Sequence, residues 1–394
     1  MKEGVLKSMV PRLTACLILA VFLGPAWGFK ISPCLRILVF KEGELSQKRI
    51  RRVNLCPLLS NEYKMAVHEH MTLSTLRDYR GHRSGALEPT ATGWWYQYMT
   101  EPEWSQRPGG RMHESHAIMF GNWWNDDPLM RVWGQGMRDF VGGALAGRKM
   151  LRADRSTYPG GVANCHVPGA AHLGRASHFG RLQHLHFMTN EQKKTSTREF
   201  RVFDTTEKAL QWMAFAYRVA TGDLAPEQSL TAELQARINL PSIAMNHCVD
   251  SDNVKIRTLF SRAGQDEAYR NRITPDVALG SMLHILQDSF SPSHACRVAR
   301  QVGSSQQALI HDVSNYREQD DDVHGAQDGY PAWLIEYVAT GRRLYDNDPV
   351  AVGAWLIGAV DDKLPWKEVE AHLRRTIFAH DRHSDPSAAD SCIH

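Results

Sequence analysis

Three side chains of the metal-ligand type are spaced along one short segment of the chain. His284, Asp288 and His294 form a His-x3-Asp-x5-His string. Imidazole nitrogens and carboxylate oxygens are ligands of zinc and of other divalent ions. If the segment is helical, His284 and Asp288 lie on one face, because residues four apart are neighbours on a helix. The spacing indicates one of two things. Either the three residues form a metal site, or His284 and Asp288 form a buried hydrogen bond in which His294 takes no part.

The residues around this string predict a helix that positions it. Thr274 suits the N-cap, Pro275 suits the first turn, and Pro292 would end the helix. Apolar residues cover this segment nearly all round, which predicts a buried helix with one polar line. A cation shared by His284 and Asp288 would offset the cost of removing both groups from water.

Helical patterns dominate the rest of the readable sequence. The clearest covers residues 207–221, opened by Asp204 and closed by Gly222. Alternating strand patterns are scarce, so we predict an all-α fold: a single multi-helix domain with long loops over a metal site. Further helices are expected at residues 64–79, 231–238, 331–343, 349–360 and 365–378, long loops at 81–110 and 158–174, and a polar tail at 385–394.

Residues 1–26 have the pattern of a secretory signal peptide, in which basic residues precede an apolar run and then small residues. Cleavage fits after Ala26, which exposes Trp27, or after Gly28. The apolar run is too short to span a bilayer, and no later segment is long enough for a transmembrane span. We therefore expect a secreted or periplasmic protein whose mature domain covers residues 27–394.

The net charge and the cysteine content restrict which class of exported protein this chain can belong to. The formal net charge is +3, and loss of the basic signal peptide leaves the mature chain close to neutral. A near-neutral chain disfavours large non-specific nucleic-acid surfaces. An even number of cysteines remains after processing, which predicts disulfides in an exported protein, with Cys34–Cys56 as one candidate pair. The absence of Cys-x2-Cys argues against a zinc ribbon.

The His-x3-Asp-x5-His string in an exported, helical chain resembles the zinc-dependent phospholipase C and P1/S1 nuclease superfamily. The resemblance implies an all-α fold that holds a cluster of zinc ions and hydrolyses phosphate esters. It also implies that Asp288 bridges two zinc ions, that His284 binds one of these, and that His294 binds a third.

Upstream segments are similar to other ligand segments of that superfamily. Val67-His68-Glu69-His70 opens a helix and resembles an early histidine ligand, with His68 preferred over His70. Asp126 is preferred over Asp127 in an aromatic segment. Ser177-His178-Phe179 resembles the segment whose histidine shares the first zinc ion, so the resemblance implies His178 as the partner of Asp126 and His284.

Downstream, the superfamily has a His-x3-Glu helix, and this chain has His324-x3-Asp328 in its place. His311 is the alternative start of that helix. Trp27 resembles the N-terminal tryptophan whose free amine binds zinc, although His68 lies much farther along the chain than the superfamily pattern requires. His184 and His186 are interpreted as groups behind the ligands or as core histidines, and His113, Glu114 and His116 have no assigned place.

The resemblance implies an exported phosphodiesterase of phospholipase C type with two or three zinc ions. The ions would activate a water for attack on phosphorus, Asp288 would hold them at the required spacing, and Asp126 would serve as ligand and general base. Phospholipid headgroup esters are the expected substrates. A transient contact with a membrane surface is expected through five tryptophans: Trp94, Trp95, Trp104, Trp123 and Trp124.

Two alternatives stay open at this point. A P1-like single-strand nuclease or 3'-nucleotidase would use the same tryptophans to stack nucleic-acid bases. An exported binding protein that is stabilised by zinc would hold the ions without turnover.

Overall fold

The structure is a computed structural model that describes residues 67–81, 103–106, 110–126, 177–178, 180, 182–230, 255–261, 266–319, 327–381 and 392. The expected signal peptide, the helix at 231–238, the loop at 158–174, most of the loop at 81–110 and most of the polar tail lie outside these residues.

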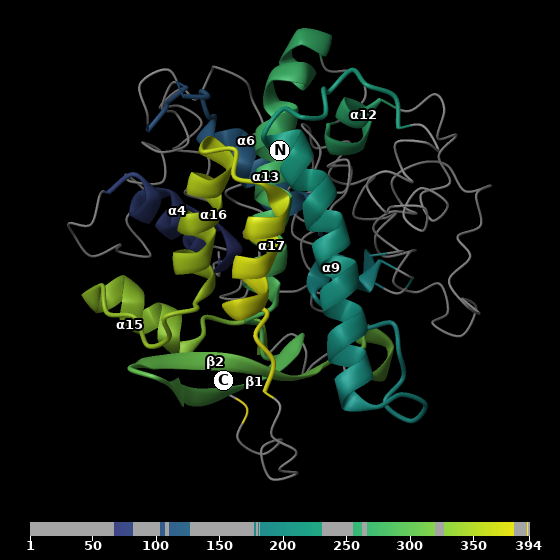
Figure 1. Cartoon of the computed structure of the whole chain (residues 1–394), viewed down its shortest axis with the longest axis vertical. Helices are drawn as coiled ribbons and strands as arrows, with labels where there is room; N and C mark the ends of the chain where they lie inside the picture. Colours follow the sequence, from purple (N-terminus) through teal and green to yellow (C-terminus); the bar gives the residue numbers. More distant parts are fainter. Residues whose placement is uncertain are drawn as a thin grey trace, which may run out of the picture.

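A long buried helix, α13 (Glu267–Asp288), runs through the centre of the described structure (Figure 1). The helix begins more than two turns before the predicted start. Asp266 is its N-cap and accepts a hydrogen bond from the Tyr269 amide, and Pro275 lies inside the helix. The prediction of a Thr274 cap was therefore wrong. Burial of the apolar surface on both sides of Pro275 outweighs the one backbone hydrogen bond that a proline removes.

Other helices surround α13 and bury its apolar surface (Figure 1). Those packed directly on α13 are α4 (Val67–Tyr79), α6 (Ser115–Trp124), the 3-10 helix η5 (Gln183–His186), α9 (Arg198–Ala220), α12 (Ile256–Phe260) and α16 (Pro349–Asp361). The described part also contains η6 (Tyr316–Glu318), α15 (Ala332–Thr340) and α17 (Trp366–Arg375).

Most predicted helices are present, but α9 is longer than its sequence pattern indicated. The helix begins after Thr197, whose side chain accepts a hydrogen bond from the Phe200 amide, whereas Asp204 lies within the helix. Residues 207–221 are the more apolar, carboxyl-terminal part, where Trp212 and Phe215 are buried. In the first turns Val202 is buried but Phe200 and Phe203 are exposed, so the apolar residues follow no helical period, which explains the late predicted start.

The all-α prediction was wrong because the chain forms a two-stranded antiparallel sheet directly after the metal-ligand string. Strand β1 (Ala295–Val302) pairs with β2 (Ser305–Val313). Gly303, with φ at +61°, forms the turn, in which glycine adopts this conformation without a Cβ clash. His311 therefore lies on a strand and does not start a helix. The hairpin is polar toward its tip, so it lacks a clear apolar alternation.

Cys296 on β1 forms a disulfide with Cys392, which confirms that cysteines of this chain pair. Cys34 and Cys56, the predicted pair, lie outside the described residues. Within the described part of the chain, no helix combines the length and apolar character that crossing a membrane requires.

Candidate metal centre

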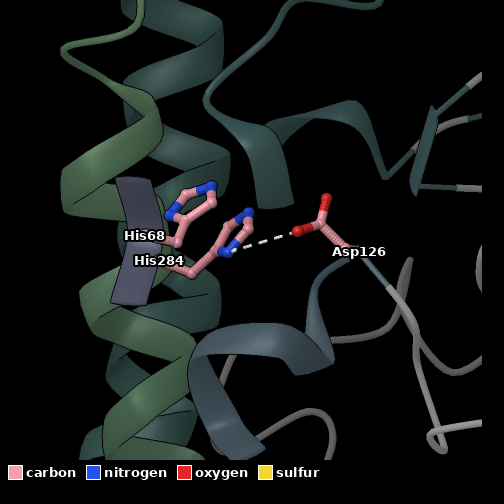
Figure 2. A group of neighbouring side chains, drawn as sticks. All are labelled: His68, Asp126 and His284. Carbon is pink, nitrogen blue, oxygen red and sulfur yellow. Dashed lines mark ion pairs between the residues drawn. The ribbon is translucent and has the colours of Figure 1, made fainter. Parts of the chain in front are cut away.

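Seven histidine and aspartate side chains from six places in the fold meet at the carboxyl end of α13. All have 0–1% exposure. Figure 2 shows three of them, with the His68 ring stacked on the His284 ring and Asp126 facing that pair. The set consists of His68 from α4, Asp126 just after α6, His178, His186 from η5, His284 and Asp288 from α13, and His294 from the turn that follows α13.

The Asp288 carboxylate lies at the centre of this cluster. Its Oδ1 is 3.3 Å from His68 Nε2. Its Oδ2 is 2.8 Å from His284 Nε2, 2.9 Å from His186 Nδ1 and 3.5 Å from His294 Nδ1. The two oxygens thus face different imidazoles, which is the arrangement of a carboxylate that can bridge two cations.

Hydrogen bonds on the other side of the rings fix how these histidines are presented. His284 Nδ1 donates to Asn122 O at 2.6 Å, and His294 Nδ1 donates to His186 O at 2.7 Å. His68 Nδ1 donates to Gln287 Oε1 at 2.6 Å. In each ring Nδ1 is the donor, so Nε2 can bind a metal ion in the neutral tautomer.

Spacing of the ligand atoms fits a metal ion at overlapping positions. Ligand atoms lie within 4.8 Å of one another in three groups: His68, Asp126 and His284; Asp126, His178 and His186; and His186, His284 and Asp288. The Nε2 atom of His186 is buried and has no hydrogen-bond partner among the described residues. Since a buried polar atom without a partner is costly, a metal ion at this position fits the chemistry of the site.

Electrostatics in the cluster favour a charged aspartate. Burial alone would raise the pKa of Asp288, yet the imidazoles of His284, His294 and His68 hold it well below its usual value. Burial lowers the pKa of His284. Burial also opposes charge on His68, but the Asp288 carboxylate outweighs it and raises the pKa of His68 to about 9. A proton on His68 therefore supplies positive charge where a cation could bind.

Two alternatives to the preferred ligands can be placed, and neither joins the cluster. His70 Nδ1 is hydrogen-bonded to the hydroxyl of Tyr330, and burial lowers the pKa of His70 to about 4. His311, on β2, contacts Asp381 at 3.2 Å and Arg198. Asp127, His324 and Trp27 lie outside the described residues.

Asp328 is buried near the cluster but is held by serine hydroxyls. The Ser291 and Ser293 hydroxyls donate hydrogen bonds to its Oδ1, the former at 2.8 Å. Burial raises its pKa well above the usual value, and the Asp288 carboxylate raises it further. A cation beside Asp328 would favour its ionised form.

The histidines without an assigned place separate into distinct roles. His186 is an integral member of the cluster, although the sequence was interpreted as placing it behind the ligands or in the core. The feature of the sequence that pointed to His186 was its closeness to the Ser177-His178-Phe179 segment. His184 is buried on the same 3-10 helix. His113 bridges Asp276 and Asp361, at 2.8 and 2.6 Å, and Glu114 pairs with Arg272 at 2.7 Å and with His116 at 3.1 Å.

The fold and the site together define a mostly helical protein with a small β-hairpin and a buried histidine–aspartate centre that could hold a metal ion. A scan against protein-family models finds no match, and searches of curated proteins and of solved structures find no significant similarity. The geometry of the centre therefore carries the functional proposal.

Proposed function

We propose that this protein is an exported, zinc-dependent phosphodiesterase of phospholipase C type that hydrolyses phospholipid headgroup esters. One observation supports this most directly: Asp288 directs Oδ1 toward His68 Nε2 and Oδ2 toward His284 Nε2. A carboxylate shared in this way suits two adjacent divalent ions, the arrangement used in many hydrolases of phosphate esters.

Zinc is the preferred ion because the ligand set consists of imidazoles and carboxylates. One ion would be held by His68 and Asp288, and a second by His284, His186 and Asp288. Asp126 and His178 adjoin the second position, with Asp126 Oδ1 3.9 Å from His186 Nδ1. A third ion would require His294 and Asp328.

Two bound ions would lower the pKa of a water molecule and neutralise phosphoryl oxygens. The protein's own groups then have defined tasks. Asp288 holds the spacing between the ligand groups, and the Nδ1 hydrogen bonds of His68 and His284 hold their rings in place. Asp126 is the carboxylate proposed to accept the proton of the attacking water.

The near-neutral charge of the chain supports a lipid substrate over a large nucleic-acid surface. The tryptophans give less support than their sequence positions suggested. Trp104, Trp123 and Trp124 are buried in the core, so the expected membrane contact through these three was wrong. The Trp123 indole donates to Glu69, and the Trp124 ring stacks on Trp212 at 5.0 Å. Trp94 and Trp95 lie outside the described residues.

The Cys296–Cys392 disulfide supports an exported protein, because disulfides persist in oxidising compartments. The expected destination is the periplasm or the extracellular medium.

The test is an assay of the purified full chain on a choline phosphodiester and on single-stranded DNA. Activity is measured for the protein as isolated, after its metal is removed with a chelator, and after zinc is added back. We expect hydrolysis of the choline ester that chelation abolishes and zinc restores. The matched variants are Asp288→Asn, expected to be inactive, and Asp312→Asn, which alters a carboxylate paired with Arg201 on the hairpin and should stay active.

Other outcomes select other functions. Preferential cleavage of DNA would select the nuclease alternative. Bound metal without hydrolysis of either substrate would select the binding protein, and hydrolysis indifferent to both chelation and Asp288→Asn would refute the proposal.

A further inference from the structure

An arginine that does not touch the cluster has an unusual environment just beyond it. The Arg297 side chain on β1 is 1% exposed. Its guanidinium donates four hydrogen bonds: Nε to Ser289 O at 2.5 Å, Nη2 to Ser289 Oγ at 2.9 Å, Nη1 to Ala308 O at 2.6 Å, and Nη2 to Ile377 O at 2.7 Å. The guanidinium carbon also lies 3.9 Å from the centre of the Phe290 ring.

No carboxylate of the described residues forms an ion pair with Arg297. Burial lowers the pKa of Arg297 well below its usual value, without an anionic neighbour to offset this. A buried cation with only neutral acceptors is costly, and an apolar side chain of similar volume would serve packing alone at least as well. The planar guanidinium therefore has a role that depends on its fork of donors.

The acceptors of Arg297 show which elements its guanidinium holds together. Ser289 directly follows Asp288 and is the C-cap of α13, where partial negative charge from the helix accumulates. Ala308 belongs to β2, and Ile377 follows α17. Arg297 thus ties the end of α13 to the hairpin and to a distant carboxyl-terminal segment.

The hydrogen bonds of Arg297 fix the segment 288–294, which carries two members of the metal centre at its ends. Asp288 precedes Ser289 directly, and His294 precedes β1 directly. The turn between them is closed by Ser291 N donating to Asp288 O and by His294 N donating to Ser291 O, each at 3.0 Å. His294 O accepts from Ser314 N at 2.8 Å, beyond the end of β2. A shift of α13 relative to the hairpin would change the placement of Asp288 against His294.

We propose that Arg297 is a positioning residue of the metal centre, which sets Asp288 and His294 in their mutual arrangement by clamping the end of α13 onto the hairpin. This inference rests on the proposed function, because it assigns Arg297 a role in metal binding by that site. Arg297 does not contact the ligands' metal-facing atoms and acts through Ser289 and the turn.

The experiment measures the binding of Co²⁺ to the full chain by visible absorption and by competition with a chelator. The variants are Arg297→Met and Arg297→Lys. The matched controls are Arg270→Met and Arg270→Lys. Arg270, on α13, resembles Arg297 in being a buried arginine that donates to neutral acceptors, here the hydroxyls of Ser261 and Thr258. It lies about 27 Å along the helix from Asp288, at about 1.5 Å per residue.

We expect Arg297→Met to weaken Co²⁺ binding by about 10-fold to 100-fold and to alter the absorption bands. Arg297→Lys should recover only part of the affinity, because an ammonium group cannot serve four acceptors in a plane. Both Arg270 variants should lower the melting temperature yet bind Co²⁺ with the affinity and spectrum of the wild type.

The inference is overturned if Arg297→Met, or Arg297→Lys where the former does not fold, keeps the wild-type affinity and spectrum. It is also overturned if the Arg270 variants weaken binding as much, because the effect is then one of general stability. A wild-type chain that binds no Co²⁺ refutes the metal centre and, with it, both proposals.

Discussion

The backbones of Gly121 on α6 and Gly280 on α13 touch where the two helices cross. A Cβ atom built on Gly280 would lie 1.9 Å from Ile118 O and 2.7 Å from Gly121 Cα, and one built on Gly121 would lie 2.0 Å from Val277 O. Only hydrogen atoms fit in this space. The close crossing allows Asn122 O to accept the hydrogen bond from His284 Nδ1 and places Asp126 beside the cluster.

Gly280→Ala should therefore separate the two helices, because the clash is with backbone and no rotamer change relieves it. We expect a loss of stability of about 3 kcal/mol and a loss of most metal binding. Denaturant unfolding and metal content after dialysis measure the two effects. The control is Gly358→Ala on α16, where the added Cβ would meet Tyr79 at an ordinary 3.4 Å and should be tolerated. Equal effects in both variants would contradict this account of the crossing.

His186 and His184 lie on the same 3-10 helix, but only His186 joins the cluster around Asp288. We expect His186→Ala to weaken zinc binding at least about 10-fold, while His184→Ala keeps the wild-type stoichiometry. Isothermal titration with zinc after chelation provides the measurement. A wild-type affinity in His186→Ala would remove His186 from the ligand set.

Metal binding should be pH-dependent through His68. The Asp288 carboxylate, acting against burial, raises the pKa of His68 to about 9, so at neutral pH the metal-free protein holds a proton on the nitrogen that a metal ion needs. Below pH 9, each unit of falling pH should cost up to about tenfold in affinity. The measurement is competition with a chelator of known protonation between pH 6.5 and 9. His68→Gln should bind more weakly and with a shallower slope; an unchanged slope would rule out His68 as the competing group.

His113 should make stability pH-dependent at a distance from the metal centre. Burial opposes its charge, but hydrogen bonds to Asp276 and Asp361 raise the pKa of His113 to about 8. A raised folded-state pKa stabilises the protein fully below the unfolded value of about 6.5, and this contribution is lost as the pH rises through 8.

The expected loss is about 2 kcal/mol between pH 6 and pH 9, from a shift of about 1.5 units at roughly 1.4 kcal/mol each. Urea unfolding of the chelated wild type and of chelated His113→Asn across this pH range isolates the contribution of His113 to stability. The pH-dependent contribution of His68 is the same in both proteins and cancels in the difference. If the difference in unfolding free energy between the two proteins does not change with pH, His113 is not charged in the folded state.

The chemical character of the centre could be predicted from the sequence alone. Helical spacing fixes His284 and Asp288 on one face, and the apolar residues around them require burial, so a buried pair with a polar or cationic partner follows from local rules. Four helices (α4, α15, α16 and α17) were predicted close to their observed positions for the same reason, since a 3.6-residue apolar period is a local property.

The other groups that meet that pair come from distant segments, and they could not be identified without the folded structure. His186 and His184 have the same type of neighbours in the sequence. Only the way η5 packs on α13 directs His186, and not His184, into the cluster. The hairpin formed because residues 295–313 could pair with each other and bury Ile310 and Val313 in the core shared with the helices, a non-local gain that outweighs weak local strand propensity. Contacts between residues far apart in the chain, such as Arg297 with Ile377, depend on how whole elements pack, and no local pattern encodes them.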